Sequence, residues 1–130
     1  MSARLIAIVS AGIGLLLPWP SSFGHHGSNV VYDLTQSITV TGTVTDFQFV
    51  NPHALIFLEA GEEGGEVVKW LAGLPSASGL GAREGWTRAT LGPGDRITIT
   101  GAPARGGAPS LWVEQIVRDG KPLLNARYTG

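Results

Sequence analysis

The three histidines of this sequence are the side chains best suited to bind a metal ion. His25 and His26 are adjacent, and His53 lies 27 residues further along the chain. If His25 is the first residue of the mature protein, its α-amino nitrogen and its imidazole can chelate one ion together. A second imidazole, which His53 can supply, completes a three-nitrogen set that suits Cu(II). We therefore place a candidate copper site at His25, His26 and His53.

The first 24 residues have the three zones of a secretory signal peptide. Arg4 gives a positive start, residues 5–17 form an uncharged apolar run, and Pro18 ends it. A membrane span needs about 20 apolar residues, so this run is too short to span a bilayer. Small residues at the −3 and −1 positions predict cleavage after Gly24, with His25 as the new N-terminus. The alternative is an uncleaved N-terminal anchor. We expect an exported, periplasmic protein that is not membrane-spanning after processing.

Two other arrangements of the histidines are open at this point. The free amine, the next amide nitrogen and His26 can form a local chelate for Cu(II) that does not use His53. Alternatively, no metal binds, because the adjacent pair is solvated and His53 bonds to backbone in the turn that Asn51-Pro52 begins. The third mature position is Gly27, so the tighter three-residue N-terminal copper motif is absent.

Alternating residue types after the leader predict a β-rich domain. From Ile38, aliphatic residues and threonines alternate, which is typical of a half-buried strand, and Gly42 within the run predicts a bulge or bend. Residues 25–37 are polar and predict an extended arm, and residues 38–130 form the domain. The expected strands cover residues 38–49, 54–60, 66–72, 96–100, 111–118 and 121–126.

The order of these elements predicts a mainly all-β fold, a small OB-like barrel of five or six strands. Residues 74–91 contain Pro75, small residues and the apolar anchors Leu80 and Trp86, so we expect a short helix or irregular turns after the third strand. Three strands, a helical insert and two further strands are the order of a Greek-key barrel of this type. A β-sandwich is the alternative. The lack of a long amphipathic helix argues against a doubly wound α/β fold.

Composition excludes several classes of site and partner. The chain has no cysteine, so it has neither a disulfide framework nor a thiolate metal site. It carries 9 Lys and Arg against 10 Asp and Glu, without a basic run, which argues against a nucleic-acid partner. We find no nucleophile elbow, no paired carboxylates and no phosphate-binding glycine loop, so we do not expect an enzyme.

Aromatic side chains give a second candidate surface. They can form a stacking face, as OB folds use for bases or sugars, or they can pack in the core. We expect Phe57 and Trp70 to lie inside, because they are on adjacent strands, and Trp86 to be partly exposed. Together with Asn51, Trp86 and Arg88 are therefore the candidate ligand-binding residues outside the metal site. The aromatic residues considered are Phe47, Phe49, Phe57, Trp70, Trp86 and Trp112.

Short motifs are spread over the whole chain after the leader. The more specific are Asn-Pro-His-Ala at residues 51–54 and Gly-Trp-Thr-Arg at residues 85–88. The others are His25-His26-Gly27-Ser28, Gly42-Thr43-Val44-Thr45, Leu91-Gly92-Pro93-Gly94-Asp95 and Asp119-Gly120. In this order they resemble an uncharacterised family of small exported bacterial proteins, known only as a domain of unknown function. The chain departs from that family at Gly27, where members have serine, and after Trp70, where members often have an acidic residue. The resemblance implies a periplasmic β-barrel domain and no established activity.

These observations predict a small periplasmic binding or accessory domain. The favoured ligand is a copper-type ion at His25, His26 and His53. The alternative is a metal-free module that binds a protein or an envelope component through the barrel face near Trp86. An arm that lies close to the His53 ring would favour the metal site, whereas an exposed apolar groove near Trp86 would favour the interaction module.

Overall fold

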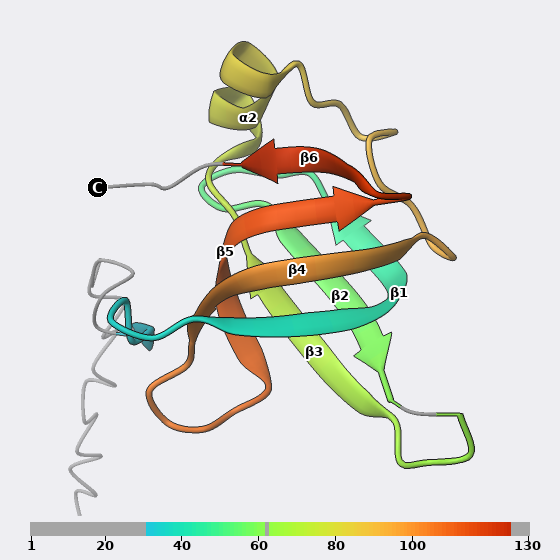
Figure 1. Ribbon diagram of the computed structural model, residues 1–130. Helices are drawn as coiled ribbons and strands as arrows, with labels where there is room; N and C mark the ends of the chain where they lie inside the picture. Colours follow the sequence, from blue (N-terminus) through green and yellow to red (C-terminus); the bar gives the residue numbers. More distant parts are fainter. Residues whose placement is uncertain (1–30, 62, 126–130) are drawn as a thin grey trace, which may run out of the picture.

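One curved sheet and one short helix make up the described part of the chain. The computed structural model describes residues 31–61 and 63–125, and these contain six strands and helix α2 (Figure 1). The elements in chain order are β1 (Ile38–Gln48), β2 (Leu55–Ala60), β3 (Val68–Gly73), α2 (Ala77–Glu84), β4 (Arg96–Pro103), β5 (Ser110–Arg118) and β6 (Lys121–Asn125). The expected order of strands is confirmed, and so is the helical insert after β3.

β1 is the longest strand and follows the alternation predicted for it. Val44 is buried, while Thr39 and Thr41 are exposed on the outer face. Their hydroxyl oxygens lie 3.0 Å and 2.9 Å from those of Thr100 and Thr98 on the neighbouring strand β4. Aliphatic side chains of β1 therefore form part of the core, and its threonines pair across the outside of the sheet.

The barrel closes where β3, at one end of the strand order, pairs with β5 near the other end. Antiparallel pairing runs in the order β3-β2-β1-β4-β5-β6, and β3 also pairs with β5 in parallel. In this closing pair Leu71 is opposite Ser110 and Gly73 is opposite Trp112. Five strands thus form a closed OB-like barrel, and β6 adds a sixth strand beside β5, as Figure 1 shows. Closure removes most of the free sheet edges.

Glycines stand where two strands approach too closely for a side chain. A Cβ added to Gly42 in β1 would lie 2.6 Å from the carbonyl oxygen of Glu59 in β2. A Cβ added to Gly101 in β4 would overlap the carbonyl oxygen of Trp112 in β5. The pairing of β4 with β5 shifts its register between Thr100 and Gly101, as expected at a β-bulge. These positions let the strands bend tightly enough to close the barrel.

Helix α2 lies at one end of the barrel (Figure 1). Ser76 caps its N-terminus, because its hydroxyl oxygen accepts a hydrogen bond from the backbone N–H of Gly79 at 3.1 Å. Gly85 ends the helix with a φ of 68°, which glycine adopts without steric cost. Leu80 is fully buried and anchors the helix to the core. Among the described residues, no helix has the length and apolar character needed to cross a membrane.

The alternation of buried and half-buried residues along β2 contradicts one of our predictions. Ile56 and Leu58 are buried, so Phe57 between them points outward and is only half-buried. The prediction that Phe57 lies inside is therefore wrong, because its neighbours on both sides occupy the core face. Trp70 packs against the core from β3, as predicted.

We predict that Gly101→Ala lowers the free energy of unfolding by at least about 2 kcal/mol, because overpacking against backbone cannot be relieved by a side-chain movement. Denaturant unfolding measures this. Gly106→Ala is the matched control, since a Cβ there meets no atom within 4 Å. Equal unfolding midpoints for the two variants would contradict the close approach of β4 to β5.

Candidate functional site

His53 lies in the loop between β1 and β2, with an exposed imidazole. The ring is not isolated. It contacts the indole of Trp112 edge to face, with ring centroids 5.4 Å apart and planes at 89°. Such a contact favours one orientation of an otherwise mobile surface side chain. The predicted position of His53 at a strand-to-strand turn is confirmed.

Helix α2 holds the loop that carries His53. The Oδ1 atom of Asn51 accepts hydrogen bonds from the backbone N–H and the hydroxyl of Ser78, at 3.1 Å and 3.0 Å. The backbone N–H of Ala77 donates to the carbonyl oxygen of Val50 at 3.1 Å. The peptide bond between Asn51 and Pro52 is cis. The side-chain amide oxygen of Asn51 therefore connects the loop to the first turn of α2.

The end of the N-terminal arm also packs against Trp112. Tyr32 forms an antiparallel bridge with Ala104, and the backbone N–H of Arg105 donates to the carbonyl oxygen of Val31 at 2.9 Å. The Tyr32 hydroxyl lies 3.2 Å from the hydroxyl oxygen of Ser110. The Tyr32 ring lies with its centroid 6.0 Å from that of Trp112. The arm is therefore attached to the barrel from Val31 onward.

A turn at Asp33 fixes the direction in which the arm joins β1. The hydroxyl and the backbone N–H of Thr35 both donate to Oδ1 of Asp33, at 2.6 Å and 3.1 Å. The hydrogen bond from the Thr35 hydroxyl is the largest cause that lowers the pKa of Asp33, and the positive charge of Arg105 lowers it further.

Trp112 brings the arm and the His53 loop to one place on the barrel surface. Because their centroids lie 6.0 Å and 5.4 Å from that of Trp112, the Tyr32 and His53 rings are separated by at most about 11.4 Å, the sum of the two. Gly73 makes room for the indole, since a Cβ there would lie 3.0 Å from the indole ring. Sequence reasoning missed this cluster of three rings. The alternation of side chains along β5 could have placed Trp112 on the outer face. Its partners Tyr32 and His53 could not be found in this way, because they come from distant segments of the chain.

Trp86 is buried, so the prediction that it is partly exposed is wrong. Its side chain is 5% exposed. Its backbone N–H donates to the carbonyl oxygen of Leu80 at 3.3 Å, because the left-handed Gly85 turns the chain back under α2. Its indole N–H donates to the carbonyl oxygen of Leu123 in β6 at 3.3 Å. The Trp86 ring therefore belongs to the core and is hydrogen-bonded to β6.

The predicted site residues therefore have different surroundings. Arg88 is exposed and makes no hydrogen bond or ion pair with the part of the chain that the structure describes. Asn51 is engaged with α2, as above. His25 and His26 lie outside the described residues. Within residues 31–61 and 63–125, no three His, Cys, Asp or Glu side chains form a group that could hold a metal ion.

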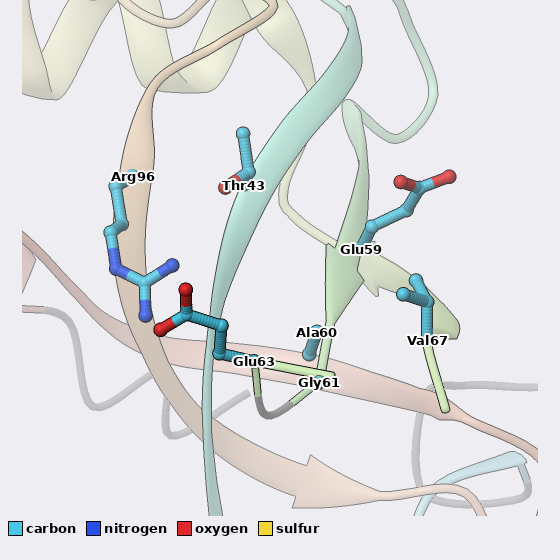
Figure 2. Close-up of a pocket in the computed structure, with 7 residues that line it drawn as sticks. All are labelled: Thr43, Glu59, Ala60, Gly61, Glu63, Val67 and Arg96. Carbon is cyan, nitrogen blue, oxygen red and sulfur yellow. The ribbon is translucent and has the colours of Figure 1, made fainter. Parts of the chain in front are cut away.

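A hollow of about 420 Å³ lies beside the loop that joins β2 to β3 (Figure 2). The Arg96 guanidinium and the Glu63 carboxylate point toward each other across it, while Glu59 extends away. All three side chains are exposed. Opposite charges in this setting are well solvated and contribute little binding energy, so we place no ligand there.

Comparison with known proteins gives a family but no activity. A family described only as a family of unknown function, DUF6152, matches residues 17–111. The matched range includes all three histidines. No curated protein matches the chain. The resemblance to an uncharacterised family is thereby confirmed.

We predict that Asn51→Ala lowers the free energy of unfolding by about 1–2 kcal/mol, because the N–H of Ser78 loses its acceptor at the start of α2. Denaturant unfolding is the measurement. Ser78→Ala keeps that N–H bond and removes only the hydroxyl, so its effect should be smaller. A variant at Asn51 as stable as the unchanged protein would show that the loop is held by other contacts.

We also predict that the carboxyl group of Asp33, in the turn that ends the arm, titrates with a lowered midpoint. A carboxylate with a lowered pKa stabilises the folded state above its usual value of 3.8, and this contribution is lost as pH falls through the lowered pKa. The NMR shift of the Thr35 amide should therefore titrate with a midpoint below 3.8, and the step should be absent in Asp33→Asn. A midpoint at or above 3.8 would contradict the hydrogen bonds at Asp33.

Proposed function

The chain belongs to DUF6152, a family of unknown function, and we propose that it is an exported binding domain that holds one Cu(II) ion between His25 or His26 and His53. The observation that supports this proposal is the position of the arm. The arm reaches the barrel at Tyr32, which contacts the same indole as His53. Cleavage after Gly24 would place the mature N-terminus in the periplasm.

Chain length allows the proposed ligands to meet. Six residue steps separate His26 from Tyr32, and an extended chain covers about 20 Å in that distance. The Tyr32 and His53 rings are at most about 11.4 Å apart, which is 6.0 Å plus 5.4 Å through Trp112. The N-terminal histidines are therefore tethered within reach of the His53 ring. Tethering raises their effective concentration at His53 without any further contact.

The donor set favours copper over the common divalent ions. An α-amine and two imidazoles provide three nitrogen ligands, and affinities of such sites for divalent ions of the first transition row peak at Cu(II). The chain offers no thiolate, because it has no cysteine. The exposed His53 ring is accessible to an incoming ion. The proposed role is binding or delivery of the ion, without a catalytic step.

The alternative proposal is a metal-free module for a protein or envelope component. Its supporting observation is the surface beside Trp86, where the half-buried rings of Phe47 and Phe49 lie with centroids 5.8 Å apart and the Arg88 side chain is exposed. The Trp86 ring itself lies beneath this surface, 6.0 Å from that of Phe47. Binding there would leave the histidines unused.

We predict that the protein secreted and processed to begin at His25 binds one equivalent of Cu(II). Isothermal titration calorimetry should show at least a tenfold loss of affinity in His53→Ala, because a three-nitrogen site becomes a two-nitrogen site. Protein that begins with one extra residue before His25 should also lose affinity, since its α-amine is displaced.

Mass spectrometry of the secreted protein fixes the N-terminus before the titration. Equal affinity of the unchanged protein and His53→Ala would remove His53 from the site and leave the local N-terminal chelate. Absence of binding in the correctly processed protein would favour the metal-free module.

A further inference from the structure

Trp112 contacts both the end of the N-terminal arm and the loop that carries His53. It lies on the outer face of β5, between the buried residues Leu111 and Val113. Its ring contacts Tyr32 of the arm and His53 of the β1–β2 loop. Its indole N–H donates no hydrogen bond within the described part of the chain. The contacts that Trp112 makes with the arm and the loop are therefore ring contacts.

We propose that Trp112 is a positioning residue, whose indole holds the His53 imidazole in the orientation that binds Cu(II). This inference rests on the proposed function. An exposed histidine without contacts loses rotamer freedom when it binds a ligand, and that loss weakens binding. Contact with a fixed aromatic ring removes part of this freedom before the ion arrives.

The barrel makes the indole a fixed support. The backbone of Trp112 pairs with Gly73 in β3 and with Ala102 in β4, so it lies in the seam that closes the barrel. Because Gly73 has no side chain, the indole can pack directly on the sheet at this position. The loop with His53 is fixed separately through Asn51. Two independently anchored elements thus define the position of the imidazole.

The same geometry gives the site an optical signature. Cu(II) quenches the fluorescence of an indole that lies within a few ångströms. An ion on His53 would lie beside the Trp112 ring, because the two ring centroids are 5.4 Å apart. The processed chain contains two other tryptophans, Trp70 and Trp86. Both are packed in or against the core and serve as internal controls.

The test uses the processed protein, copper sulfate and two substitutions of Trp112. Trp112→Phe keeps an aromatic ring at this position and should bind Cu(II) within about twofold of the unchanged protein. Trp112→Leu covers Gly73 without an aromatic ring and should bind about two- to tenfold more weakly. The electron paramagnetic resonance spectrum of bound Cu(II) should be retained in the Phe variant and altered in the Leu variant.

Fluorescence gives a second readout, which reports how close the bound ion lies to the indole of Trp112. Copper should quench the unchanged protein and the control Trp70→Phe, and most of this quenching should be lost in Trp112→Phe. Undiminished quenching in Trp112→Phe would overturn the inference. Unchanged affinity and an unchanged spectrum in Trp112→Leu would also overturn it, even though His53→Ala still loses affinity. If the unchanged protein and His53→Ala bind alike, the proposed function itself fails.

Discussion

The parallel pairing of β3 with β5 is the contact on which the rest of the structure depends. It converts an open antiparallel sheet into a closed barrel, and it places Gly73 directly opposite Trp112. A closed barrel has few sheet edges to protect and buries one continuous core, and this sequence has no cysteine that could add a disulfide. The strands achieve this closure by bending at positions without a side chain, of which Gly101 has the closest backbone neighbour.

The ring cluster around Trp112 is a consequence of that closure. Trp112 faces outward because the residues on either side of it fill the core, and its position in the seam brings it next to the β1–β2 loop and the arm. The rings of two segments that are separate in sequence, Tyr32 in the arm and His53 in the loop, therefore both contact Trp112. A metal ion bound between the arm and His53 would join these segments, so that binding and attachment of the arm would reinforce each other.

Much of the fold could be predicted from local patterns, because period-two alternation and turn residues depend on near neighbours. The strands, the helical insert and the Asp119-Gly120 turn, with φ values of 53° and 72°, follow from such patterns. The burial of Trp86 could not, because it depends on tertiary contacts, among them those with Phe47 and with the carbonyl oxygen of Leu123. The ring cluster at Trp112 was hidden for the same reason. His53 was found by its residue type alone, without knowledge of what holds it.

The central claim is that one copper ion joins the mature N-terminus to the β1–β2 loop. Anomalous diffraction at the copper edge, from crystals of the secreted protein grown with one equivalent of Cu(II), locates the ion directly. The account predicts a single strong peak within bonding distance of an imidazole nitrogen of His53 and of the α-amino nitrogen of His25. A peak bonded to the N-terminus but remote from His53, or no peak near either, would contradict it.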